Sequence, residues 1–118
     1  MDWIMGLQRA VDYIEAHLTE QISYEDVARE AYVSPFYFQR VFSILCGYTV
    51  GEYIRNRRLT LAGSELLATD QKVIDLALKY GYETPESFTR AFTRFHGITP
   101  SAARLTLAPL TSFARLSI

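Results

Sequence analysis

The amino-acid sequence predicts an all-α protein built around two helix-turn-helix units. The segment SPFYFQRVFSILCGYT, residues 34–49, recurs fifty residues later as TPESFTRAFTRFHGIT, residues 84–99. Each copy opens on Ser/Thr-Pro, closes on Gly-x-Thr, and places a Phe, an Arg and a second Phe at the same positions. Outside the copies, apolar residues recur at the spacing of amphipathic helices. A repeat of this length is typical of a duplicated structural unit.

The first unit is predicted to hold three helices. An apolar stripe at helical spacing marks the first: Ile4, Leu7, Val11, Ile14 and Leu18. Ser23 can cap a short second helix, with Asp26 in the capping-box position. Ser34 can cap the third, which starts at Pro35 and stops at Gly47. We expect four side chains of this third helix to face the core: Phe38, Val41, Phe42 and Leu45.

A long helix over residues 50–68 is predicted to come next. Thr49 and Glu52 form a complete capping box at its start. Six apolar residues line it: Ile54, Leu59, Leu61, Ala62, Leu66 and Leu67.

The second unit is predicted to repeat the first. Its short opening helix is formed by Val73, Ile74, Ala77 and Leu78, and Leu76 and Ala77 align with Val27 and Ala28 of the first unit. Its turn over residues 81–83 is one residue longer than in the first unit. A helix then runs from Thr84-Pro85 to Gly97, and a last one from Thr99-Pro100 to about Leu105.

Four parts follow from this pattern: a first helix-turn-helix subdomain (1–48), a linker helix (49–68), a second helix-turn-helix subdomain (69–108) and a tail (109–118). The tail alternates partly in the manner of a strand. Two interpretations of it stay open, a frayed end and the start of a further C-terminal domain.

The composition indicates a cytoplasmic protein without membrane contact. Hydrophobic residues make up 49% of the 118, which is ample for a core. No apolar run reaches the roughly 18 residues of a membrane span, and the start lacks the basic region of a signal peptide. The single cysteine, Cys46, fits a reducing compartment and is expected to be a buried structural thiol.

The charges are segregated, although the net charge is only −1. Residues 1–32 hold seven acids and two arginines, and residues 63–87 hold five acids and two lysines. Residues 33–62 hold four arginines and one acid, and residues 88–118 hold four arginines and no acid. The two basic blocks begin at the repeated helices, where they can meet phosphate. The alternative is that these arginines pair with acids of neighbouring helices.

The outward residues of the repeated helices suit the reading of base edges in double-stranded DNA. Arg40 and Arg90 can each bond O6 and N7 of guanine, Gln39 can bond adenine, and Glu86 can accept from N4 of cytosine. The other candidates for base contacts are Phe36, Tyr37, Ser87 and Thr89. Phe36 and Tyr37 would lie against a thymine methyl or, alternatively, form part of the core.

Phosphate contacts are expected at the starts of the same helices, near Ser34 and Thr84, where backbone N–H groups and the helix dipole favour anions. Further candidates are Arg55, Arg57, Arg58 and Arg94.

No enzymatic constellation is recognisable. His17 and His96 lie far apart, and neither has a paired acid or cysteine at ligand spacing. His96 falls in the last turn of its helix, where bonding a free carbonyl is the simpler role. We therefore expect no catalytic residues, metal or cofactor.

Residues 4–106 resemble the DNA-binding domain of the AraC/XylS family of bacterial transcription regulators. Its signature is matched closely by VIDLALKYGYETPESFTRAFTRFHGITPSAAR. The resemblance implies seven helices, with two helix-turn-helix lobes joined by the long helix and two recognition helices in successive major-groove segments. It places base contacts at Phe36, Gln39, Arg40, Glu86, Ser87 and Arg90. Glu86 departs from the glutamine that relatives often carry.

The resemblance also implies function: a sequence-specific regulator, expected to be an activator that contacts RNA polymerase. APLTSFARLSI is similar to the junction before a GyrI-like domain, and a small-molecule effector would act only through such a C-terminal domain. The rival interpretations are a stand-alone regulator and, for the helices themselves, a protein–protein interaction module.

Overall fold

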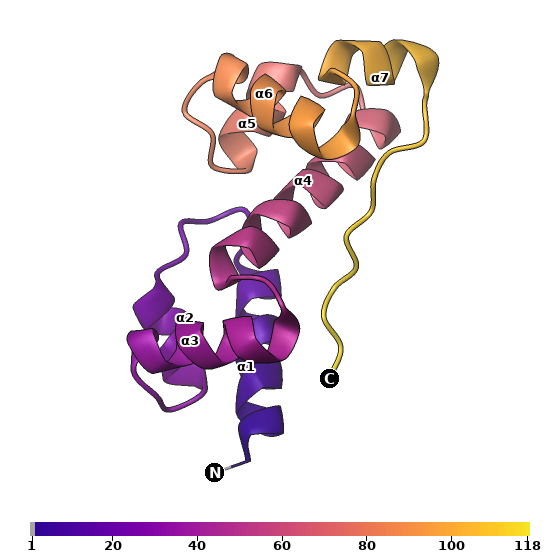
Figure 1. Ribbon diagram of the computed structural model, residues 1–118. Helices are drawn as coiled ribbons and strands as arrows, with labels where there is room; N and C mark the ends of the chain where they lie inside the picture. The colour runs from indigo at the N-terminus through magenta and orange to yellow at the C-terminus, as the bar shows by residue number, and fades with distance from the viewer. Residues whose placement is uncertain (1) are drawn as a thin grey trace. The chain divides into compact units, whose positions relative to one another are not determined.

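The computed structural model describes residues 2–118, and within them it is all-α, which confirms the predicted fold class (Figure 1). Its helices are α1 (Trp3–Ala16), α2 (Tyr24–Glu30), α3 (Pro35–Cys46), α4 (Val50–Ala68), α5 (Val73–Lys79), α6 (Pro85–His96) and α7 (Pro100–Thr106). The chain divides into two compact units. Unit 1 comprises the chain up to Arg55 with Ala114–Ile118, and unit 2 comprises Asn56–Phe113, so α4 contributes residues to both.

Unit 1 packs α1 on α2 and α2 on α3. Its largest fully buried side chains include Val11, Ile14, Val27, Phe38 and Phe42, together with Tyr53 from the first turn of α4. Burial of such side chains contributes on the order of 1.5–3 kcal/mol each.

Two predicted core positions of unit 1 are wrong: Ile4 and Leu45 are each 61% exposed. Ile4 lies in the first turn of α1, before Leu7, which is the first buried side chain of the apolar stripe. On α3 the inward row follows i+4 spacing from Phe38 to Phe42 and so continues to Cys46, not to Leu45. Cys46 is itself only half-buried, and this partial burial raises the pKa of its thiol.

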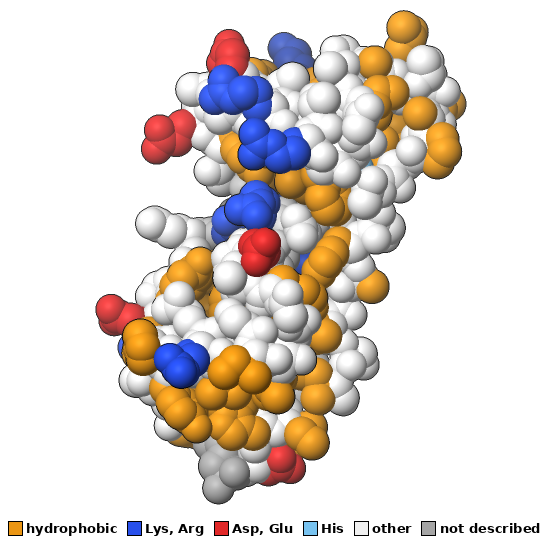
Figure 2. Space-filling model, viewed as in Figure 1, with side chains coloured by type: hydrophobic (Ala, Val, Ile, Leu, Met, Phe, Trp, Pro, Cys, Tyr) orange, Lys and Arg blue, Asp and Glu red, His pale blue; other side chains and the backbone are white. Residues whose placement is uncertain are grey.

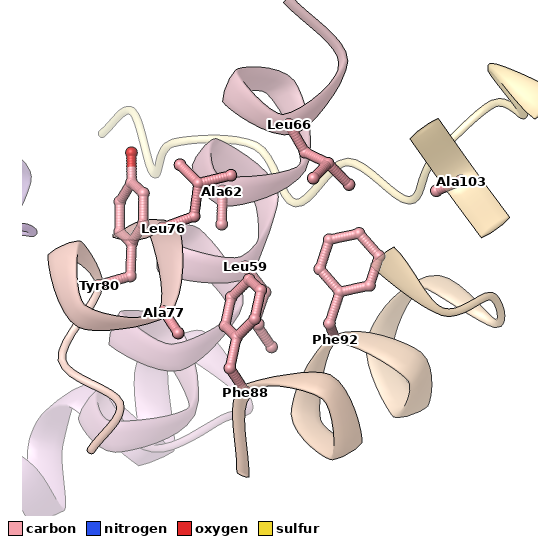
Figure 3. Packing of buried hydrophobic residues seen from close by; sticks show 9 residues of the cluster. All are labelled: Leu59, Ala62, Leu66, Leu76, Ala77, Tyr80, Phe88, Phe92 and Ala103. Atoms are coloured by element: carbon pink, nitrogen blue, oxygen red, sulfur yellow. The ribbon is translucent and has the colours of Figure 1, made fainter. Parts of the chain in front are cut away.

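Unit 2 has a core to which four helices contribute (Figure 3). Leu59, Ala62 and Leu66 come from α4, Leu76, Ala77 and Tyr80 from α5, Phe88 and Phe92 from α6, and Ala103 from α7. Two other apolar residues of α5, Ile74 and Leu78, are 46% and 58% exposed. Helix α5 is apolar on more than one side, and its face with Leu76, Ala77 and Tyr80 packs in the core of unit 2.

The helix starts follow the predicted capping chemistry with one exception. At α4 the Thr49 N–H donates to Glu52 Oε1 at 2.9 Å and the Glu52 N–H donates to Thr49 Oγ1 at 3.0 Å, so the capping box is confirmed. At α2 the Ser23 hydroxyl accepts from the Glu25 N–H. The expected box with Asp26 is wrong, since Asp26 pairs with Arg29 at 2.8 Å.

The tail after α7 has neither helix nor strand and is anchored by hydrogen bonds. Within unit 2, the N–H groups of Thr111 and Phe113 donate to His96 Nδ1 and to Thr60 Oγ1. Within unit 1, the N–H groups of Leu116 and Ile118 donate to the Tyr53 hydroxyl and to Gln8 Oε1, and the Arg115 guanidinium donates to Asp12 Oδ1.

Candidate nucleic-acid interface

Helices α3 and α6 begin and end alike. The Ser34 hydroxyl accepts from the Tyr37 N–H at 3.2 Å, and the Thr84 hydroxyl accepts from the Ser87 N–H at 3.1 Å. A proline follows each cap, where its missing N–H leaves no bond unmade. Both helices end at the glycine predicted to stop them, and both glycines are left-handed, with φ of 81° at Gly47 and 77° at Gly97. Matching positions of α3 and α6 are therefore held by the same kinds of interaction at both helix ends.

Paired phenylalanines fix the rotation of each helix. Phe38 and Phe42 are at most 1% exposed, with ring centroids 5.8 Å apart; Phe88 and Phe92 are fully buried, 5.6 Å apart. Because these rings lie inward, the positions of Arg40 and Arg90 are turned to the surface, and both side chains are exposed.

The turns before the two helices share one motif. A left-handed residue follows each short helix, Tyr32 with φ of 56° and Gly81 with φ of 88°. The Val33 N–H then donates to the Ala28 carbonyl, and the Tyr82 N–H donates to the Ala77 carbonyl. These are the bonds of a Schellman motif. The extra residue of the second turn is therefore Glu83, which lies between this motif and the α6 cap.

The outer face of α3 carries exposed aromatic side chains and one cation, Arg40. Phe36 is 75% exposed and Tyr37 is 47% exposed, with the Tyr37 ring 5.9 Å from that of Trp3. Within residues 2–118, Arg40 has no hydrogen bond or ion pair. Gln39 is half-buried and its Nε2 donates to the Pro35 carbonyl at 3.3 Å, a weak bond that a base can displace. Phe36 and Arg40 are thus the most available contacts.

The outer face of α6 is polar. Glu86 and Arg90 are exposed, and Thr89 is half-buried. The Ser87 hydroxyl donates to the Thr84 carbonyl at 2.9 Å and lies 3.0 Å from the Thr84 hydroxyl. Since its single proton is used in the cap, Ser87 has an acceptor lone pair to offer a base, and a donor only if the cap opens.

The candidate phosphate ligands differ in how free they are. Arg94 is exposed, and none of the described residues bonds it. Arg55 is exposed and helps to lower the pKa of Glu52, which falls mainly through the hydrogen bond from the Thr49 N–H. Arg57 is half-buried and donates from Nη1 to the Phe113 carbonyl at 2.6 Å. Arg58 is half-buried near Gly81.

Figure 2 shows one face of the molecule. Over unit 2 several Lys and Arg side chains gather on it, whereas over unit 1 apolar side chains predominate. This agrees with the difference between the outer faces of α6 and α3.

Two buried polar residues of unit 2, Thr60 and His96, share a role that the sequence did not reveal: each accepts a hydrogen bond from the tail. Thr60 and His96 are the buried polar side chains of the described chain, each 8% exposed, and both hold the tail. His96 does bond a carbonyl, as expected, but that of Leu59 in α4. The only available signal was the i, i+4, i+8 row of Phe88, Phe92 and His96.

Across residues 2–118, no three His, Cys, Asp or Glu side chains are grouped so as to hold a metal ion. In the same range no helix has the length and apolar character to cross a membrane.

A family model described as a helix-turn-helix domain matches residues 27–106. The chain is 42% identical over 107 residues to the uncharacterized HTH-type transcriptional regulator YbfP of Bacillus subtilis, which covers 91% of this chain and 36% of that protein. It is 42% identical over 93 residues to the HTH-type transcriptional activator AarP of Providencia stuartii, covering 79% and 69%. The chain thus spans little more than a third of the first relative.

Solved structures agree. A transcriptional regulator of AraC type from Chromobacterium violaceum superimposes with a TM-score of 0.80 at 27% identity, covering 87% of this chain and 92% of that one. The DNA-binding domain of AdpA, solved with a target DNA, gives 0.77 at 30% identity, covering 86% and 91%. The chain, with its duplicated helices, therefore belongs to the AraC-type family of helix-turn-helix DNA-binding transcription regulators.

Proposed function

We propose that this chain reads a two-part operator in double-stranded DNA, with α3 in one major-groove segment and α6 in the next. The observation that carries the proposal is the pair Arg40 and Arg90. They occupy the same position of two helices with matching caps and matching glycine ends, both are exposed, and neither has a partner among the residues described.

The α3 half-site combines guanine with thymine and adenine. Arg40 bonds O6 and N7 of a guanine, and Phe36 packs on a thymine methyl, with Tyr37 beside it. Gln39 bonds an adenine after releasing the Pro35 carbonyl. This surface is mainly apolar and carries one guanidinium, that of Arg40.

The α6 half-site is read by charge and hydrogen bonds. Arg90 bonds guanine, and Glu86 accepts from N4 of cytosine, a contact that rejects a carbonyl at that place. Thr89 and Ser87 lie close enough to the same face to contact bases or phosphates. An acid here weakens general attraction to the backbone, so α6 depends more on the correct base than α3 does.

Phosphates are bound by the backbone N–H groups at the starts of α3 and α6, near Ser34 and Thr84, and by Arg55, Arg58 and Arg94. Arg57 is a weaker candidate than Arg94, because its Nη1 already donates to the Phe113 carbonyl.

The biological role that fits is activation of transcription in the bacterial cytoplasm, with RNA polymerase as a protein partner. The similarity to an activator, AarP, and to a domain solved on its target DNA supports this role. A small-molecule effector would act through a further domain, as the length of YbfP relative to this chain allows.

Selection of bound duplexes from a random pool tests the proposal. We expect two motifs with centres about one helical turn, roughly 34 Å, apart. A single motif, or recovery of every sequence alike, would contradict reading by two helices. A steep loss of affinity with salt separates DNA binding from the alternative of a protein–protein interaction module, whose apolar contacts respond little to salt.

A further inference from the structure

His96 is fixed through both of its ring nitrogens. Its Nε2 lies 2.8 Å from the Leu59 carbonyl oxygen, and its Nδ1 lies 3.1 Å from the Thr111 backbone nitrogen. The Thr111 N–H can only donate, so Nδ1 must be the unprotonated, accepting nitrogen. The proton is therefore on Nε2 and is donated to Leu59. A neutral ring in this one tautomer satisfies both bonds, and a protonated ring loses the bond to Thr111.

A glycine in α4 makes room for this ring. A Cβ built on Gly63 would lie 3.0 Å from His96 Nε2 and 2.9 Å from Leu110 Cδ1. Glycine inside a helix lowers stability relative to alanine, so its presence within the 19 residues of α4 requires a reason. The close approach of His96 and of the tail supplies that reason.

The ring ties the last turn of α6 to α4 and to the tail. It continues the buried row of Phe88 and Phe92, with its centroid 4.3 Å from that of Phe92 and 4.7 Å from that of Phe95. Packing of the phenylalanines resists displacement of α6 from the core but is not directional. The hydrogen bond to Leu59 is directional, and it sets where the helix end lies along α4.

We propose that neutral His96 is a positioning residue for α6, holding that helix in the placement from which Glu86 and Arg90 reach their bases. The inference rests on the proposed role of α6 as a reader. A proton on Nδ1 breaks the Thr111 bond, places a charge in the core and loosens α6, so reading of the second half-site weakens while reading by α3 does not.

The surroundings of His96 favour the neutral form. The ring is contacted by the Leu59 carbonyl and lies beside Gly63 of α4, and it packs on Phe92 and Phe95 of α6. From the tail, the Thr111 N–H bonds it. The charged side chains of these elements in unit 2 are Arg57, Arg58, Glu65, Glu86, Arg90 and Arg94. None of them is among the causes of the pKa change: burial lowers the pKa of His96 from 6.5, and the bond to Leu59 raises it by less.

The sign of the pH effect follows. A loosened ring titrates near 6.5 and the positioned ring titrates lower. Above both values no proton is bound and the positioning is complete. As the pH falls below 6.5, protons bind the loosened form first, and the placement of α6 is progressively lost.

The test compares the full chain with His96→Gln between about pH 7.5 and 5.5. The glutamine Nε2 can still donate to Leu59, but the side chain does not titrate. Binding is measured to the selected duplex and, separately, to duplexes in which the first or the second motif is scrambled. The measured quantity is the ratio of the affinity for the intact duplex to that for the duplex with a scrambled second motif. We expect this ratio to fall by up to about tenfold on acidification for the wild type, and to stay constant for the variant.

The matched control is His17→Gln in unit 1, the chain's other histidine, which is expected to keep the wild-type pH profile. Parallel profiles for wild type and His96→Gln, or a loss that tracks the first motif, would overturn the inference. Absence of DNA binding by the wild type at about pH 7.5 would count against the proposed function instead.

Amide exchange provides a readout that needs no DNA. Protection of the Thr111 N–H, bonded to His96, should be lost on acidification before that of the Phe113 N–H, bonded to Thr60. In a second variant, Gly63→Ala, the new Cβ should weaken recognition of the second motif at every pH, with Ser64→Ala as the neutral control. Equal protection of both amides at every pH, together with unchanged binding by Gly63→Ala, would show that His96 positions nothing.

Discussion

The two units share a scaffold but not a surface. Helices α3 and α6 have the same length, the same proline after the cap and the same left-handed glycine at the end. Their buried phenylalanines occupy matching positions of the repeat, Phe38 and Phe42 in α3 and Phe88 and Phe92 in α6. Outside, however, Phe36 stands where the second unit has Glu86. The comparison shows that capping and core residues specify how each helix is held, and that the outward positions are free to differ with the DNA they read.

The strongest test of this division uses two neighbours in α3. Phe38→Ala empties a core position and should lower the free energy of unfolding by about 3–5 kcal/mol. Phe36→Ala removes a ring that is 75% exposed and should change stability little. Urea unfolding measures both. A large stability loss from Phe36→Ala would mean that this ring belongs to the core and is not a reader.

The next largest effect should come from the arginines common to both units. Arg40→Ala and Arg90→Ala should each weaken binding to the selected duplex by about 1–3 kcal/mol and relax one base position, each in its own motif. Arg29→Ala is the control, since that arginine pairs with Asp26 on α2. Titrations on single-base variants of the duplex give the answer. Relaxation of the same position by both variants would show that the helices do not read separate motifs.

Much of this comparison was predictable from the sequence, because caps, helix ends and the Phe rows are local. Ser34, Gly47, Thr84 and Gly97 act through residues four or fewer positions away, so a short stretch of sequence contains the whole interaction. The inward faces of short or terminal helix turns were less predictable. Leu76 and Leu78 are equally apolar, and partners in other helices decide which of them is buried.

The tail could not be predicted for a related reason. Phe113 bonds Thr60, and Leu116 bonds Tyr53, through backbone N–H groups across more than fifty residues. Any residue but proline has such a group, so no side-chain pattern records the bond. The role of His96 was hidden in the same way, because its partners are the backbone of Leu59 and Thr111.

The turns offer a smaller test in which the units should differ. Gly81→Ala places a side chain at φ of 88°, and should lower stability by about 1–2 kcal/mol from backbone strain. The new Cβ would be in ordinary contact, 3.7 Å from Arg58 Nη1, so crowding adds little. Tyr32→Gly relieves the same strain in unit 1 but loses the guanidinium of Arg9, 5.3 Å from the ring centroid. Since an exposed cation–π contact contributes about 0.5–1 kcal/mol, Tyr32→Gly should give a net gain smaller than the loss at Gly81, about 0–1.5 kcal/mol. Equal and opposite changes at the two turns would show that the Tyr32 ring contributes nothing to unit 1.

The smallest expected effect concerns salt and separates arginines within unit 2. Each phosphate contact contributes about 0.9 to the slope of log affinity against log salt. Arg94→Ala should reduce the slope by about this amount, because its exposed side chain has no partner in the described chain. Arg57→Ala should reduce it less, because the Arg57 Nη1 donates to the Phe113 carbonyl at 2.6 Å and a phosphate would have to compete for it. Fluorescence titrations across a series of salt concentrations resolve the two. If Arg57→Ala reduces the slope as much as Arg94→Ala does, the tail does not withhold that guanidinium from DNA, and the anchoring seen at Phe113 has no bearing on phosphate binding.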